Sequence, residues 1–128
     1  MSVLLDTQVF IWATDDDSKL SRAARECLAD PEIEKNMSIA SFWEMTIKIS
    51  LGKLRLSQSP ANLIERLMEN EAVQLIAIEP RHLRRLETLP FHHRDPFDRM
   101  MIAQVLEDGL SVVSSDVLWD AYGVTRIW

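Results

Sequence analysis

Acidic residues stand at the junctions between elements in the segment 92–116, which reads HHRDPFDRMMIAQVLEDGLSVVSSD. Asp95 precedes a proline and so suits the cap of a helix, and Asp98 falls in the first turn of that helix. Asp98 also lies on the apolar stripe of the helix, where a carboxylate is costly unless something compensates it. Asp116 comes just after the strand-like run LSVVS, with one serine between them. The segment therefore predicts carboxylates where a helix begins and a strand ends, the oxygen ligands that hard divalent cations prefer.

Two more acids occupy comparable positions nearer the start of the chain. Asp6 ends the apolar run SVLL, which predicts a strand. Ser41 and Glu44 have the spacing of a capping box, which places Glu44 in the first turn of a helix that Gly52 ends. Glu44 also lies four residues before Lys48, so the two side chains share one face of that helix.

The elements alternate between strands and helices, which predicts an α/β domain with a mainly parallel sheet. We expect strands near residues 2–5, 35–39, 73–78, 110–114 and after Gly123, and helices over 7–14, 22–30, 41–51, 60–70, 80–89 and 96–108. Leu63, Ile64, Leu67 and Met68 should face inward, and the acids at 15–17 should lie in a solvated loop. Sites in such sheets form beyond the C-terminal ends of the strands, and helices following the strands begin at that edge. The connectivity therefore predicts that the four acids meet there.

Length and composition set the class of protein. The 128 residues, 47% hydrophobic and 27% charged, are typical of one globular domain spanning residues 1–128. The single cysteine, Cys27, excludes an internal disulfide framework and fits a reducing compartment. No apolar run approaches the roughly 20 residues of a membrane helix, and the early strand leaves no room for a signal peptide. We therefore expect a cytoplasmic protein without a membrane partner.

The net charge of −6 argues against a simple electrostatic nucleic-acid binder, which would be basic. An acidic protein can still act on a phosphate backbone if cations occupy its acidic site and local basic residues hold the strand. Each acid singly has a structural interpretation as a helix cap, an ion-pair partner or a turn residue. Together they are harder to explain, because two carboxylates 4 Å apart repel by about 4 kcal/mol at an effective dielectric of 20.

Such a group of carboxylates needs either shared protons or a cation. Oxygen ligands in this number suit Mg²⁺ or Mn²⁺. Zinc is disfavoured, because Cys27 is alone and His92 and His93 are adjacent without the spacing of zinc ligands. We interpret both histidines as loop residues rather than as acid–base groups.

Three segments of the sequence resemble the PIN domain family and, more narrowly, the VapC toxins of type II toxin–antitoxin pairs. They are LLDT near the start, SFWEMTIKISLGKL in the middle, and HHRDPFDRMMIAQ with the later VVSSD. The resemblance spans nearly the whole chain. It implies a PIN-like three-layer α/β/α domain with a mainly parallel five-stranded sheet. It also implies a Mg²⁺- or Mn²⁺-dependent endoribonuclease that leaves a 5′ phosphate and a 3′ hydroxyl.

The resemblance also assigns residues to the site. The catalytic and metal-binding quartet maps onto Asp6, Glu44, Asp98 and Asp116. Because Mg²⁺ takes only one or two carboxylates directly, we expect Asp6 and Asp98 as direct ligands and the other two acids directly or through water. Asp95 belongs to the same DPFD motif, either as a helix cap alone or also as an outer-shell ligand or a residue that positions a water. Thr7 matches the small hydroxyl residue after the first acid, and Ser114 replaces a frequent threonine.

Basic and aromatic residues are candidates to hold RNA. The substrate-binding candidates are Thr7, Lys48, Arg94, Arg99 and Ser114, with Lys53 as a further cation. Each base has the alternative interpretation of an ordinary solvated charge. Trp12, Trp43, Trp119 and Trp128 could stack on bases, although packing in a core or an interface is the commoner role of such side chains.

The resemblance further implies an RNA substrate, a cognate VapB-like antitoxin, a homodimer, and contact with DNA only through the antitoxin. A basic antitoxin segment would complement the acidic pocket, and the apolar helices 41–51 and 60–70 are candidates for the partner groove. Two other functions remain open. One is a non-catalytic PIN-like module that only binds its antitoxin and DNA. The other is a phosphatase with an N-terminal aspartate, although LLDTQV lacks the usual second aspartate two residues on.

Overall fold

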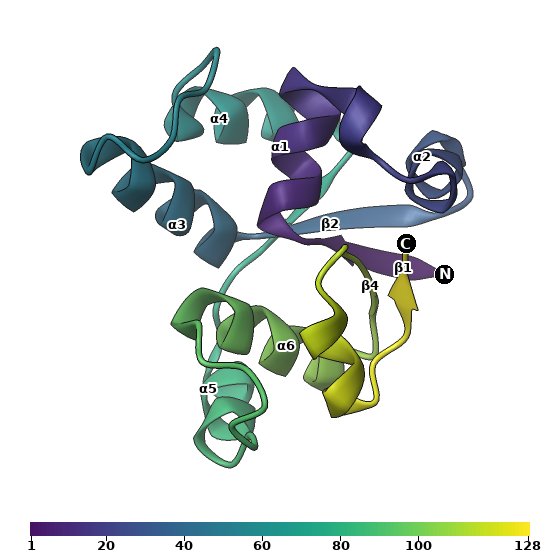
Figure 1. Ribbon diagram of the computed structural model, residues 1–128, viewed down its shortest axis with the longest axis vertical. Helices are drawn as coiled ribbons and strands as arrows, with labels where there is room; N and C mark the ends of the chain where they lie inside the picture. Colours follow the sequence, from purple (N-terminus) through teal and green to yellow (C-terminus); the bar gives the residue numbers. More distant parts are fainter.

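Five parallel strands form the centre of the computed structural model, which describes residues 1–128 (Figure 1). In the chain they are β1 (Ser2–Leu5), β2 (Glu34–Ser38), β3 (Gln74–Ile76), β4 (Ser111–Val113) and β5 (Arg126–Ile127). Their order across the sheet is β3-β2-β1-β4-β5, and all four neighbouring pairs are parallel. The predicted three-layer α/β/α fold with a parallel five-stranded sheet is therefore confirmed.

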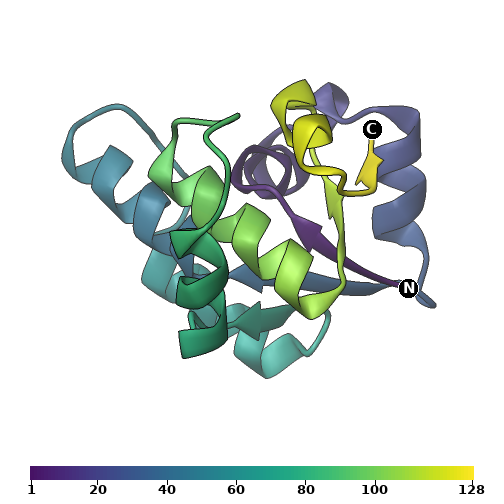
Figure 2. The ribbon, with the colours of Figure 1, turned by 90° about the horizontal axis from the view of Figure 1, so that it is seen from below.

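Helices cover both faces of the sheet. One face carries α1 (Thr7–Asp15), the short 3₁₀ turn η1 (Asp17–Lys19), α2 (Arg22–Ala29), α3 (Ile39–Ser50) and α4 (Pro60–Asn70). The other carries α5 (Pro80–Glu87), α6 (Pro96–Asp108) and the 3₁₀ helix η2 (Val117–Tyr122). Seen from below, α5, α6 and the yellow C-terminal segment lie on the near side of the sheet (Figure 2).

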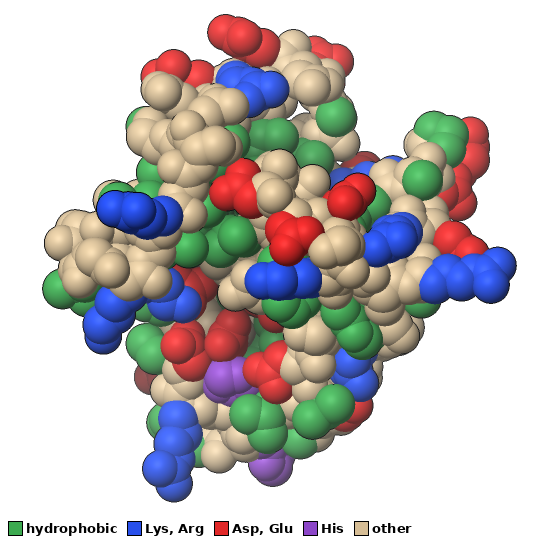
Figure 3. All heavy atoms as spheres, turned by 45° about the horizontal axis from the view of Figure 1, so that its top comes forward, with side chains coloured by type: hydrophobic (Ala, Val, Ile, Leu, Met, Phe, Trp, Pro, Cys, Tyr) green, Lys and Arg blue, Asp and Glu red, His purple; other side chains and the backbone are tan.

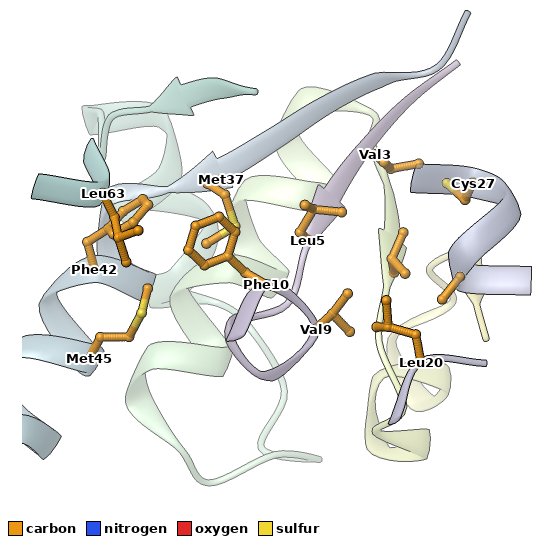
Figure 4. Packing of buried hydrophobic residues seen from close by; sticks show 12 residues of the cluster. Val3, Leu5, Val9, Phe10, Leu20, Cys27, Met37, Phe42, Met45 and Leu63 are labelled. Carbon is orange, nitrogen blue, oxygen red and sulfur yellow. The ribbon is translucent and has the colours of Figure 1, made fainter. Parts of the chain in front are cut away.

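Alternation along the central strand divides the core between the two faces. Val3 and Leu5 point into the cluster beneath α1 to α4, whereas Leu4 points into the cluster beneath α6 and η2. On the first face Phe10 and Phe42 meet edge to face with ring centroids 5.6 Å apart, which joins α1 to α3 (Figure 4). Because β1 is buried on both faces, its end is held firmly, and Asp6 follows it at once.

The start of α3 differs from the prediction. The helix begins at Ile39, and Ser38, the last residue of β2, caps it by accepting the N–H of Ala40 at 3.1 Å. The strand therefore passes into the helix without a loop. Ser41 is not the cap but a buried residue inside the helix, and Glu44 lies in the second turn rather than the first.

Two smaller expectations also need correction. Residues 73–78 were expected to form a buried strand, but only Gln74–Ile76 pair, and they are half-exposed because β3 is an edge of the sheet. Met68 was expected to face inward, but 69% of it is exposed, because α4 contacts the core through Leu63, Ile64 and Leu67. No helix in the structure has both the length and the apolar character needed to cross a membrane.

The two-sided burial of β1 gives a first test. We expect Leu4→Ala to lower the free energy of unfolding by about 2–5 kcal/mol, because Leu4 is fully buried and its loss leaves a cavity. Met68→Ala, on exposed α4 surface, should change it by less than about 0.5 kcal/mol. Urea denaturation followed by circular dichroism measures both. Equal effects of the two substitutions would contradict the core described above.

Candidate metal centre

A pocket of about 310 Å³ opens at the C-terminal edge of the sheet, beyond the ends of β1 and β4 and beside α3 and α6. Its lining includes five carboxylates, namely Asp6, Glu44, Asp95, Asp98 and Asp116. Figure 3 shows acidic side chains gathered in a hollow on this face, next to a histidine and with basic side chains on one side of it. The expectation that the four quartet acids meet at one edge therefore agrees with the structure.

Asp6 is held by the strand beside it. Its backbone N–H continues the pairing of β1 with β4 by donating to the carbonyl of Val113 at 3.0 Å. The hydroxyl of Ser114 donates to Asp6 Oδ2 at 2.6 Å and accepts the backbone N–H of Asp116 at 3.0 Å. Ser114 therefore links two acids of the quartet. It is fully buried and does not line the pocket, so in this structure it supports the acids and is not placed to contact a substrate.

A chain of buried hydroxyl groups supports the pocket from α1. Thr7 donates to Ser41 Oγ at 2.8 Å, and Ser41 donates to the sulfur of Met101 at 3.1 Å. These contacts join α1, α3 and α6 next to the acids. Thr7 also lines the pocket, where it remains a candidate for contact with substrate.

Glu44 reaches the pocket from α3 and is almost completely buried. Its Oε2 pairs with Lys48 Nζ at 3.0 Å, as the spacing of four residues predicted, so one base does compensate one acid of the group. Its Oε1 is buried without any hydrogen-bond partner. A buried acceptor without a partner costs about 1–3 kcal/mol, so this oxygen would gain from a cation or a water that reached it.

Asp95 and Asp98 come from the start of α6. Asp95 caps the helix, because its Oδ1 accepts the N–H groups of Phe97 at 2.9 Å and Asp98 at 3.0 Å. Burial, followed by the charges of nearby acids, raises the pKa of Asp98 to about 8. The acids that contribute are Asp6, Asp95, Glu44 and Asp116. The pKa of Asp6 is also raised, chiefly by burial, against a lowering contribution from the hydroxyl of Ser114.

His93 lies in a loop, as we expected from the sequence, but its side chain reaches this group of acids. Its Nε2 lies 2.8 Å from Asp116 Oδ2 and 3.2 Å from Asp98 Oδ2. Only 8% of the residue is exposed. His92 points elsewhere, against the ring of Tyr122. Nothing in the spacing of the two histidines distinguishes them, because the conformation of a loop decides which one reaches the acids.

The basic candidates occupy different places. Lys48 and Lys53 line the pocket, whereas Arg94 is exposed outside its lining. Arg99 is buried to 93%, and its guanidinium donates to the carbonyls of Leu89 and Pro90 at 3.0 and 2.8 Å. Its prediction as an RNA-binding residue is therefore not retained, because a buried cation whose donors are engaged by backbone carbonyls cannot reach a strand.

The tryptophans divide in the same way. Trp119 is fully buried, and Trp12 packs on Trp128 with ring centroids 5.7 Å apart. Trp43 is 60% exposed and meets Phe97 edge to face, with ring centroids 5.2 Å apart. Trp43 directly precedes Glu44 in α3, and Phe97 directly precedes Asp98 in α6. The packing interpretation thus agrees with Trp119, Trp12 and Trp128, whereas most of Trp43 is exposed.

The fold and this pocket together define an α/β protein with a candidate site for a divalent cation. A family model described as "PIN domain" matches residues 3–123, and the chain belongs to this family. The resemblance seen in the sequence is therefore confirmed at the level of the family. A comparison with curated protein sequences finds no match.

Solved structures with the same fold include toxin–antitoxin complexes. VapBC2 from Rickettsia felis, bound to a DNA fragment from its promoter, superposes with a TM-score of 0.70 at 11% identity, covering 98% of this chain and 97% of that one. DNA-bound VapBC from Salmonella typhimurium superposes with a TM-score of 0.69 at 13% identity, covering 98% of this chain and 96% of that one. FitAcB from Neisseria gonorrhoeae superposes with a TM-score of 0.66 at 15% identity, covering 97% of this chain and 95% of that one. At these identities the likeness shows a shared fold.

The raised pKa of Asp98 predicts how the cation-free protein responds to pH. An aspartate in the unfolded chain titrates near 3.9, so the folded state holds the proton more tightly, and this group's contribution to stability is lost as the pH rises towards 8. We expect Asp98→Asn to raise the free energy of unfolding at pH 8 in EDTA by about 1–3 kcal/mol and to change it little at pH 4.

Urea denaturation at both pH values measures the effect. Asp17→Asn, which alters an exposed acid remote from the pocket, is the matched control and should change nothing at either pH. A less stable Asp98→Asn protein at pH 8 in EDTA would show that the acids of the pocket do not repel one another as described.

Proposed function

We propose that this protein is a VapC-like toxin, a metal-dependent endoribonuclease that hydrolyses RNA phosphodiester bonds and is inhibited by a cognate antitoxin. The observation that supports the proposal most is the gathering of four largely buried carboxylates in one pocket with too little positive charge to balance them. Membership of the PIN domain family supports the same class of reaction.

The residues of the pocket fit a divalent cation. The donor set is carboxylate oxygen, which suits Mg²⁺, with Mn²⁺ as a substitute, and one buried oxygen of Glu44 lacks any protein partner. In the proposal Asp6 and Asp98 bind the ion directly, and Glu44 and Asp116 bind it directly or through water. When bound, the ion supplies positive charge that neutralises the phosphate and lowers the pKa of a water.

The chain's own residues would perform the other parts of the reaction. Lys48 and Lys53 lie at the pocket, where their charges can hold phosphates on either side of the bond that is cut. Glu44 and Asp116 can accept a hydrogen bond from the attacking water and so orient it. Asp95, already engaged as the cap of α6, lines the pocket and could accept from a water of the ion's outer shell. Arg94 would contact the strand farther out.

The proposed partners follow from the same comparison. The superposed VapBC and FitAcB structures are named for two-component complexes, and two of the structures contain DNA. We infer that this chain forms a homodimer, pairs with a VapB-like antitoxin and reaches DNA only through it. A basic antitoxin segment would complement the acidic pocket. Trp43 and Leu51 on the α3 side and Met68 on α4 expose apolar surface where such a partner could pack.

Loss of a quartet acid is the direct test of the ribonuclease. We expect Asp6→Asn and Asp98→Asn to reduce cleavage of total RNA in Mn²⁺ by at least about 100-fold, because a direct ligand of the ion is lost. Asp17→Asn should cleave as the wild type does. Circular dichroism verifies that each variant is folded, and mapping the new RNA ends should find 5′ phosphates.

Three other results would each change the conclusion. Full cleavage by both quartet variants would overturn the nuclease. A folded wild type that binds neither Mn²⁺ nor RNA would favour the non-catalytic binding module. Hydrolysis of p-nitrophenyl phosphate without RNA cleavage would favour the phosphatase.

The antitoxin proposal has its own test in growing cells. Expression of the wild-type chain should arrest growth, co-expression of the cognate antitoxin should relieve the arrest, and Asp98→Asn should be harmless at equal protein level. The physical reason is that the antitoxin and RNA compete for one acidic pocket. Growth arrest that is as strong with Asp98→Asn would separate toxicity from this pocket.

A further inference from the structure

We propose that His93 is a positioning residue that donates its Nε2 hydrogen to Asp116, places the same N–H group beside Asp98, and so orients these two carboxylates without itself binding the cation. The inference rests on the proposed function, because it assigns the carboxylates to a cation. It goes beyond that function by giving a role to a side chain outside the acidic quartet. The hydrogen bonds made by the imidazole ring of His93 support this role.

The hydrogen bonds around the ring of His93 decide which of its nitrogens carries the hydrogen. The backbone N–H of Asp95 donates to His93 Nδ1 at 3.1 Å, so Nδ1 is an acceptor and has no hydrogen. The remaining ring hydrogen is therefore on Nε2, which lies 2.8 Å from Asp116 Oδ2 and 3.2 Å from Asp98 Oδ2. A nitrogen that carries a hydrogen has no free lone pair, so His93 in this arrangement is a donor and not a ligand.

This assignment decides between two interpretations of one cluster. His93, Asp98 and Asp116 offer potential ligand atoms that all lie within 4.8 Å of one another, which by distance alone could be a mixed nitrogen and oxygen metal site. Turning the hydrogen to Nδ1 would free Nε2 for a metal, but it would set two N–H groups against each other at Asp95. The hydrogen bond to the backbone therefore favours the donor role.

Two side chains hold the backbone that carries the ring of His93 in place. The backbone N–H of His93 donates to the hydroxyl of Tyr122 at 2.8 Å, and that hydroxyl donates to the carbonyl of Pro90 at 2.7 Å. The buried guanidinium of Arg99 donates to the carbonyls of Leu89 and Pro90 and, at 3.4 Å, to that of His93 itself. The loop that carries His93 is thus fastened to α6 on one side and to η2 on the other.

The N–H group of His93 restricts the orientation of the acids beside it. Asp116 Oδ2 accepts from His93, while its Oδ1 accepts the N–H of Leu118 at 3.0 Å, so the carboxylate is fixed at both oxygens. Each oxygen keeps a further lone pair for a cation or its water. The same His93 Nε2 lies 3.2 Å from Asp98 Oδ2. Removing the imidazole would leave Asp116 held only at Oδ1 and would take the neighbouring N–H group away from Asp98.

Two spectroscopic measurements test the proposal on the full-length protein without using RNA. Nitrogen-15 NMR of the cation-free protein should show His93 with its hydrogen on Nε2. Electron paramagnetic resonance of bound Mn²⁺ should show no direct coupling to a histidine nitrogen. We expect His93→Ala to weaken Mn²⁺ binding about 10–100-fold, as the loss of such supporting partners commonly does.

Matched variants separate positioning from folding. His93→Gln offers an amide N–H at a similar distance along the side chain and should restore most of the Mn²⁺ affinity, whereas a purely structural ring would not be replaced. His92→Ala removes the neighbouring exposed ring and should leave Mn²⁺ binding unchanged. If His93→Ala does not fold, the Mn²⁺ affinity of His93→Gln and the two wild-type spectra decide the question.

The results that overturn the proposal are distinct. A direct nitrogen coupling to Mn²⁺ that disappears in His93→Gln would make His93 a ligand, and unchanged Mn²⁺ affinity in folded His93→Ala would make it merely structural. A wild type that does not bind Mn²⁺ would overturn both this inference and the proposed function. Normal Mn²⁺ results without RNA cleavage would overturn the proposed function alone.

Discussion

Repulsion between carboxylates is the constraint on which the rest of this structure depends. Two such charges 4 Å apart cost about 4 kcal/mol at an effective dielectric of 20. Five carboxylates line this one pocket. Lys48 balances part of the charge of Glu44, and the start of α6 favours Asp98 by about 0.3–1 kcal/mol. These contributions do not remove the strain, since the pKa of Asp98 is still raised to about 8. This surplus of negative charge is the property by which the pocket would attract the cation that we propose.

The topology of the sheet explains why these acids can be brought together at all. The chain builds β1, β2 and β3 towards one edge and then returns to place β4 and β5 on the other side of β1. The order of strands therefore reverses between β1 and β4, and the ends of strands at such a point leave a crevice that helices do not fill. Asp6 follows β1, and Asp116 lies just beyond β4. The two acids farthest apart in the sequence thus come from neighbouring strands.

This geometry also explains which parts of the site could be predicted. The positions of Asp6, Asp98 and Asp116 depend on where strands end and a helix begins, and apolar periodicity with a proline locates those points. Glu44 was placed at the right edge, although its helix starts earlier, because Ser38 and Ser41 are both plausible caps and only the length of β2 decides between them. The residues before α6 carry no periodicity. The burial of Arg99 and the approach of His93 to the acids depend on that loop, so sequence patterns could not reveal them.

The groups that support the acids are mostly neutral, and this follows from the same constraint. Thr7, Ser41 and Ser114 fix the walls of the pocket with hydroxyl groups, which orient oxygens without cancelling their charge. Arg99 follows Asp98 directly in the sequence, and a guanidinium paired with that acid would compete with a cation for it. Because successive helical residues point about 100° apart, Arg99 is instead directed to backbone carbonyls. A buried arginine can therefore stabilise the adjoining loop while the pocket beside it keeps its negative charge.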